Sequence, residues 1–165
     1  MISNATGMVH LVASVIALIT GTMVLIGTKA TKKHQKIGYV YSLSMLVLLA
    51  TSFMIYRLHG TFGVLHVFSV ISGATLLAGM LPMFVKRPKD YLQYHFSFMY
   101  WSVIGLYCAF AAEIFTRIPI LFELGKDITV TFYALVGLSA AAVGGVGSIY
   151  FRKYKDSWKA LYQNN

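Results

Sequence analysis

The fold is decided by residues 8–28, MVHLVASVIALITGTMVLIGT, which contain no Lys, Arg, Asp or Glu. A helix of these 21 residues is about 31 Å long, enough to cross a bilayer core of about 30 Å. A signal peptide is the weaker interpretation, because the leader MISNATG has no basic residue and the apolar stretch is long for such a region. The stretch therefore predicts a membrane-spanning α-helix.

The composition of the whole chain extends this prediction. Of its 165 residues 58% are hydrophobic and only 12% are charged, whereas soluble domains carry about 25% charged residues. Lipid must therefore cover the excess apolar surface. None of the later apolar stretches shows the alternation of a β-strand. We expect an all-α polytopic membrane protein, a single bundle of five transmembrane helices. The four further spans are expected at about 37–56, 62–85, 96–115 and 130–151.

Basic residues gather in alternate connections between the expected spans, and they predict the topology. By the positive-inside rule the N-terminus lies outside and the C-terminus is cytoplasmic, in a multi-pass protein of the cell (inner) membrane. The net charge of +9 then reflects loops at an anionic bilayer surface, so nucleic acid is not an expected partner. The cytoplasmic clusters are Lys29, Lys32, Lys33 and Lys36, then Lys86, Arg87 and Lys89, then Arg152, Lys153, Lys155 and Lys159; the opposite loops hold Arg57, Arg117 and Lys126.

Four histidines occupy the ends of the expected spans in alternation. His10 and His66 lie near the outer ends of the first and third spans, and His34 and His95 just before the second and fourth spans on the inner side. Two neutral imidazoles facing each other supply both axial ligands of a six-coordinate haem iron. The order therefore predicts two bis-His sites for haem b, one per membrane face, and electron transfer across the membrane with a redox partner.

An outer metal site is an alternative interpretation. Glu113 lies near the outer end of the fourth span, at the depth of His10 and His66. Two imidazoles and a carboxylate can hold zinc with a fourth position open for water, and His59 offers a further ligand. Glu113 can equally pair with an arginine near the headgroups. A third interpretation is a membrane scaffold or accessory subunit without a cofactor.

Two patterns concern packing. Small residues recur every four positions in the fifth span, at Gly137, Ala141 and Gly145, and an adjacent stripe holds Ala140, Gly144 and Ser148. Such a face lets another helix approach closely. We expect that helix to belong to the same chain, with a homo-oligomer as the alternative. Tyrosine and tryptophan gather near the ends of the spans, Tyr41 and Trp158 among them, which predicts an interfacial aromatic belt.

The alternating histidines resemble the core of the cytochrome b561 type, in which four helices supply two bis-His haem sites in this order. The chain is still more similar to a family of uncharacterised bacterial membrane proteins, DUF2306. That resemblance rests on Val9-His10-Leu11, on the segment 33–41 (KHQKIGYVY), and on residues 95–99 leading to Arg117. It covers about residues 8–117, leaves the fifth span outside, and implies a fold without an established activity.

Overall fold

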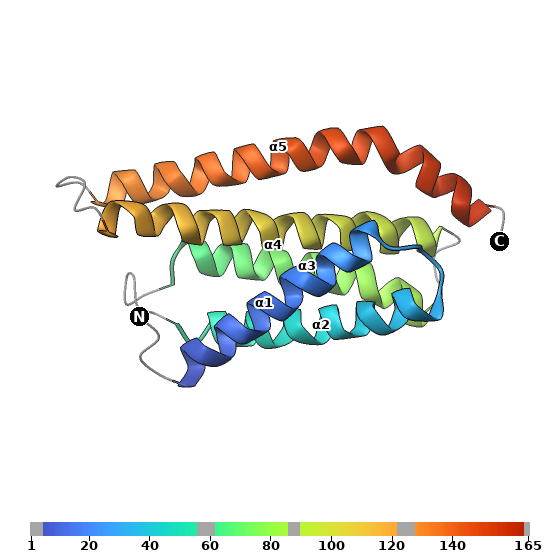
Figure 1. The fold of residues 1–165 in the computed structure, drawn as a ribbon, viewed down its shortest axis with the longest axis horizontal. Coiled ribbons are helices and arrows are strands. Elements are labelled where there is room, and N and C mark those ends of the chain that lie inside the picture. Colours follow the sequence, from blue (N-terminus) through green and yellow to red (C-terminus); the bar gives the residue numbers. More distant parts are fainter. Residues whose placement is uncertain (1–4, 56–61, 86–89, 122–127, 164–165) are drawn as a thin grey trace.

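Five helices make up the fold, in a computed structural model that describes residues 5–55, 62–85, 90–121 and 128–163. Each helix runs antiparallel to the one before it (Figure 1). No strand lies in these ranges, so the all-α prediction is confirmed for the described residues. The helices are α1 (Ala5–Ile26), α2 (Lys32–Ser52), α3 (Val64–Val85), α4 (Tyr91–Leu121) and α5 (Ile128–Gln163).

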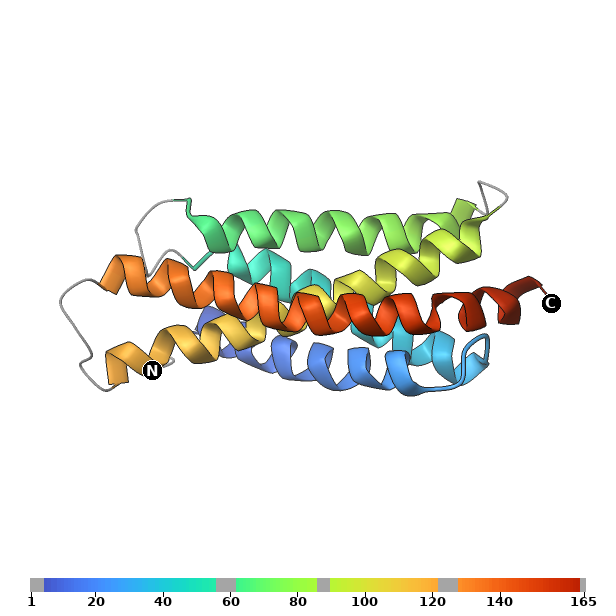
Figure 2. The ribbon, with the colours of Figure 1, turned by 90° about the horizontal axis from the view of Figure 1, so that it is seen from above.

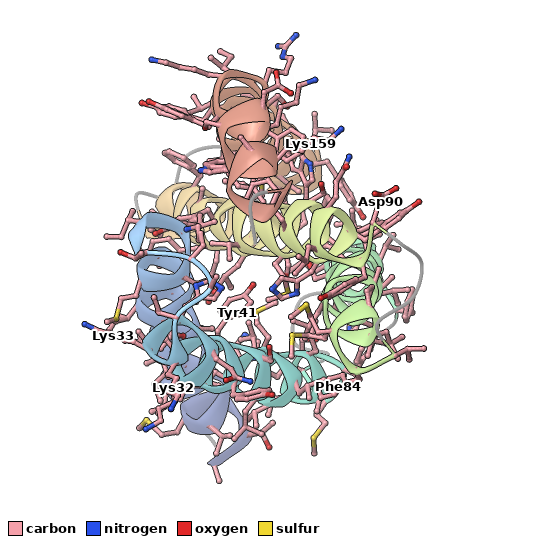
Figure 3. The ribbon with its side chains drawn as sticks, turned by 90° about the vertical axis from the view of Figure 1, so that its right-hand side faces the viewer. Lys32, Lys33, Tyr41, Phe84, Asp90 and Lys159 are labelled. Carbon is pink, nitrogen blue, oxygen red and sulfur yellow. The ribbon has the colours of Figure 1, made fainter. Side chains whose placement is uncertain are left out.

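The first four helices form a ring and the fifth lies outside it. The closest packing joins α1 to α2, α3 to α4 and α4 to α5, while α1 also touches α4 and α2 touches α3. Across the centre of the ring, α1 therefore faces α3 and α2 faces α4 (Figure 3). Helix α5 lies on the outer side of α4 and runs the length of the bundle (Figure 1 and Figure 2).

Four of the five helices are long and apolar enough to cross a membrane: α1, α3, Tyr91–Phe115 of α4 and Val130–Ala160 of α5. The same criterion does not select α2, whose first turns carry three lysines, Lys32, Lys33 and Lys36. Membrane spans are thus supported for four of the five predicted helices. The observed α4 and α5 extend well past the predicted limits of 115 and 151.

The centre of the ring is filled by a few fully buried side chains. Tyr41 has none of its surface exposed, and Met45, Leu76 and Val103 pack around it. The prediction that Tyr41 belongs to the interfacial belt was therefore wrong, because its side chain points into the bundle (Figure 3). Outward-facing leucines show the opposite pattern: Leu138 is 66% exposed, as a lipid-facing surface requires.

Helix α5 packs on α4 beside the first of the two predicted stripes, and Cys108 of α4 contacts the carbonyl oxygen of Ala140 in the adjacent stripe. A Cβ atom added at Gly137 or Gly145 would have no heavy atom within 4 Å, and Ala141 is exposed. A Cβ atom at Gly147, in contrast, would lie 2.8 Å from Cγ2 of Ile104 in α4. The fifth helix thus packs within the chain as expected, but its closest approach is at Gly147 and not at Gly137, Ala141 and Gly145.

Candidate histidine sites at the two ends of the bundle

The four histidines lie in two layers, one at each end of the ring. His34 in the first turn of α2 and His95 in the second turn of α4 lie at one end, which we call the inner end. His10 of α1 and His66 of α3 lie at the other, the outer end. In each layer the two histidines come from helices that face each other across the ring.

The inner pair shares a cavity. Its volume is about 20 Å³, which is enough for one water-sized group. Apolar atoms form most of the wall, and the cavity is partly open to its surroundings. The lining residues are Val24, Leu25, Lys29, His34, His95, Phe96, Met99 and Tyr100.

His95 is held in one orientation by α3. Its Nδ1 atom lies 2.7 Å from the carbonyl oxygen of Gly79. A carbonyl only accepts, so Nδ1 donates the proton and the neutral ring keeps a lone pair on Nε2. Histidines that bind metals are usually fixed in this way, with the other ring nitrogen donating to a carbonyl or carboxylate.

His34 has an unused nitrogen. Its Nδ1 atom is buried and has no hydrogen-bond partner among the described residues. Burial lowers the pKa of His34 below its ordinary value of 6.5, and the charges of Lys29 and His95 lower this pKa further. The neutral form of the ring is therefore favoured, with its lone pair on one of the two nitrogens, and a buried Nδ1 without a partner costs about 1–3 kcal/mol.

Lys29 stands at the wall of the same cavity and closes the end of α1. Its Nζ donates to the carbonyl oxygens of Val24 and Leu25, at 2.6 and 2.5 Å, and of Gly27, at 3.1 Å. Burial lowers the pKa of the amine. The connection between α1 and α2 turns at Ala30, whose φ of 58° is left-handed. Lys29 thus lies beside His34 and His95 at the cavity.

At the outer end, His10 is oriented by α2. Its Nδ1 lies 3.0 Å from the hydroxyl of Thr51. That hydroxyl has one proton and lies 2.8 and 2.9 Å from the carbonyl oxygens of Val47 and Leu48, so it accepts from the imidazole. Nε2 of the neutral His10 therefore carries a lone pair. Glu113 of α4 interacts electrostatically with this ring.

His66 differs from the other three histidines. Its Nδ1 accepts the backbone N–H of Gly63 at 3.1 Å, so the proton of the neutral ring is on Nε2. The ring stacks on Phe62, with centroids 5.1 Å apart, and lies 6.1 Å from the ring of Phe53. In this orientation His66 accepts from the residue that directly precedes α3, and ligation through Nε2 requires its proton to move to Nδ1.

The outer zinc site is not assembled in the described structure. Among the described residues no three His, Cys, Asp or Glu side chains lie where they could hold a metal ion, so His10, His66 and Glu113 do not form such a group. Glu113 is exposed. His59 lies outside the described residues, as do Arg57 and the side chain of Arg117, with which Glu113 was expected to pair.

Sequence reasoning missed the residues that orient the histidines. Thr51 and Gly79 carry no chemical signal of their own, because a hydroxyl and a backbone carbonyl occur throughout membrane helices. Their spacing in the sequence does not reveal the contact either, since Gly79 lies 16 positions before His95, on the preceding helix. Only the packing of α3 on α4 brings Gly79 and His95 together.

Comparison with known proteins identifies a matching family. A family model described as a predicted membrane protein, DUF2306, matches residues 7–149. This range includes most of α5, so the limit at residue 117 expected from the sequence was too short. No curated protein and no solved structure matches the chain.

Proposed function

The chain belongs to the DUF2306 family of predicted membrane proteins, and from this premise we propose that it carries electrons across a membrane through haem b held by histidine pairs. The proposal includes α2 as a fifth span. The apolar part of this helix begins at Ile37, after the three lysines, and the helix packs closely along α1, which is apolar enough to cross the bilayer. We also propose that the protein lies in the cell membrane, with its N-terminus outside.

The inner pair is the observation that carries the proposal. His34 and His95 come from opposite helices and line one apolar cavity, and each neutral ring has a nitrogen with a lone pair available. This donor set fits a bis-imidazole haem iron. Lys29 at the wall supplies a positive charge suited to a carboxylate of the porphyrin. Haem, when bound, would supply one-electron redox chemistry at this end of the ring.

The size of the inner cavity sets a condition on binding. About 20 Å³ holds a water molecule but not a macrocycle, so the bundle must open for haem to enter. The α1–α2 and α3–α4 hairpins pack more closely within themselves than against each other. Separation of these two hairpins is therefore the movement that would make room between His34 and His95.

The outer pair fits haem less closely than the inner pair. His10 has a lone pair on Nε2 and a fixed orientation, as an axial ligand requires. His66 is held in the other tautomer by Gly63, so its ligation depends on losing this hydrogen bond. We therefore expect the inner site to bind haem more tightly than the outer one.

The experiment is a reduced-minus-oxidised visible spectrum of the detergent-purified protein, expressed with adequate haem, together with its iron and zinc content. A sharp low-spin haem b band with one or two irons per chain is the expected result. Alanine variants of His34 and His95 should each lose the inner haem and keep the outer one, and variants of His10 and His66 the reverse. Full haem retention in all four variants would refute the histidine assignment.

Two other outcomes point to other functions. A colourless protein that contains stoichiometric zinc would favour a hydrolytic or regulatory metal site, and the same alanine variants would locate it. A colourless protein without metal would overturn the electron-transfer proposal and favour a scaffold or accessory subunit.

A further inference from the structure

The last turns of α5 carry two adjacent rows of side chains. Phe151, Tyr154 and Trp158 follow one another at spacings of three and four residues, which places them on one face of the helix. Arg152, Lys155 and Lys159 follow the same spacing one position further along, on the neighbouring face. We call these the aromatic row and the basic row.

The aromatic row fixes this part of α5 against the start of α4. The ring centroid of Trp158 lies 4.4 Å from that of Phe96 and 5.8 Å from that of Tyr100. Phe151 lies 6.1 Å from Phe96 with nearly parallel rings, and the Tyr100 hydroxyl donates to the Gly147 carbonyl at 2.8 Å. The end of α5 is thus packed onto the bundle and does not project away from it.

This packing sets the depth of the basic row. Phe96 lies near the inner end of the apolar segment Tyr91–Phe115 of α4, and it lines the inner histidine cavity with Tyr100. A side chain that packs on Phe96 therefore lies at the boundary between hydrocarbon and headgroups. Amphipathic helices with aromatic and basic faces bind at this level of a bilayer.

All three residues of the basic row are exposed. Asp156 is the only acidic residue in the segment 152–160, so the segment keeps a positive charge. Figure 3 looks at this end of the bundle and shows Lys159 of α5 on the side opposite Lys32 and Lys33 of α2. The basic row is thus separate from the lysines that begin α2.

We propose that the basic row binds the phosphate groups of anionic phospholipids and thereby holds Trp158 against Phe96. The lipid supplies negative charge at the depth of the row, and the aromatic row supplies the apolar contact. Because Phe96 and Tyr100 line the inner cavity, the bound lipid keeps that side of the cavity covered. The proposal does not depend on the histidines and holds whether or not they bind haem.

The test follows Trp158 in the full chain, in nanodiscs of phosphatidylcholine with or without phosphatidylglycerol. The chain has two tryptophans, so Trp101→Phe leaves Trp158 as the only tryptophan signal. Acrylamide quenching then reports how much of the population has Trp158 seated. We expect phosphatidylglycerol to lower the quenching, and added salt to reverse this by screening the charges.

The decisive variant is Arg152→Gln/Lys155→Gln/Lys159→Gln in the same background. Each cation near an anionic surface contributes about 1 kcal/mol, so the ratio of released to seated tail should rise on the order of 100-fold in anionic discs. In neutral discs the variant and the parent should quench alike. These exposed glutamine substitutions leave the buried contacts unchanged.

The matched control is Lys32→Gln/Lys33→Gln/Lys36→Gln, which removes the same charge from the start of α2 at the same end of the bundle. It should quench like the parent in both kinds of disc. The proposal is overturned if phosphatidylglycerol has no effect on the parent, as it would be if the row binds an acidic protein instead. It is also overturned if the control variant releases Trp158 as fully as the basic-row variant.

Discussion

The hydroxyl of Tyr41 and the hydroxyl of Ser102 lie 2.9 Å apart at the centre of the bundle. Tyr41 follows His34 by seven residues in α2, and Ser102 follows His95 by seven residues in α4. Each is therefore about 10 Å deeper than its histidine, on the same side of its helix. This contact joins two helices that face each other across the ring, at a level between the two histidine layers.

This hydrogen bond should stabilise the bundle by a measurable amount. Tyr41→Phe and Ser102→Ala should each lower the free energy of unfolding by about 0.5–1.5 kcal/mol, because each leaves the other hydroxyl buried without its partner. The double variant should cost little more than either single variant, since both remove the same bond. Unfolding of all four proteins in mixed detergent micelles gives the four free energies of this cycle.

A coupling near zero in that cycle would contradict the prediction. Interhelical hydrogen bonds in membrane proteins average about 0.6 kcal/mol, so the free energies must be measured to within a few tenths. Ser139→Ala is a suitable control, because the hydroxyl of Ser139 donates to Leu135 of its own helix and not to another helix.

The two layers of histidines could be predicted from the sequence, but the contact of Tyr41 with Ser102 at the level between them could not. Hydrophobic length and alternating charge determine where each helix begins, and these positions place His34 and His95 at one end and His10 and His66 at the other. Tyr41 lies only four residues inside the expected span, so its position suggested an interfacial ring. Its burial depends on how α2 is rotated in the ring, which no local pattern reveals.

The sequence also left open which face of α5 packs on α4. Glycines at 137, 144, 145 and 147 offer several faces on which another helix can approach closely. The choice depends on the partner surface, here Ile104 and the Tyr100 hydroxyl of α4. The tautomers of His10 and His66 are set in the same way, by neighbours brought close in space.

Leucine substitutions at two glycines of α5 test this packing directly. Gly147→Leu should separate α5 from α4 and lower the free energy of unfolding by about 1–3 kcal/mol, because its Cβ would already lie 2.8 Å from Ile104. Gly145→Leu, two residues away, meets open space and should be neutral or slightly stabilising, since it removes a glycine from a helix. Thermal unfolding in detergent measures both variants. Equal effects would show that this face of α5 is not the one that packs.

The pH dependence of stability should carry a contribution from His34. Its pKa is below 6.5 in the folded protein, so the unfolded chain binds a proton first as the pH falls. The contribution is fully present above pH 6.5 and is lost between 6.5 and the lowered folded pKa. His34→Gln should therefore lose less stability than the parent between pH 7 and pH 5, as unfolding at a series of pH values will measure. A parent and variant with parallel pH profiles would show that His34 is solvated like an ordinary surface histidine.

If the histidine layers bind haem as proposed, Thr51 should tune the outer site alone. Thr51→Val keeps the shape of the side chain but removes the hydroxyl that accepts from Nδ1 of His10. Partners that orient a ligating histidine typically change metal affinity about 10–100-fold, so the outer haem should dissociate more readily by about that factor. The inner haem should be unaffected, because Thr51 is 17 residues along α2 from His34. Haem titration of the apoprotein, followed in the visible spectrum, separates the two sites. Ser52→Ala is the neighbouring control, because the hydroxyl of Ser52 lies within hydrogen-bond distance of the Ser69 hydroxyl and the Leu49 carbonyl oxygen, away from His10. Equal losses in the two variants would mean that the end of α2 acts through packing and not through the orientation of His10.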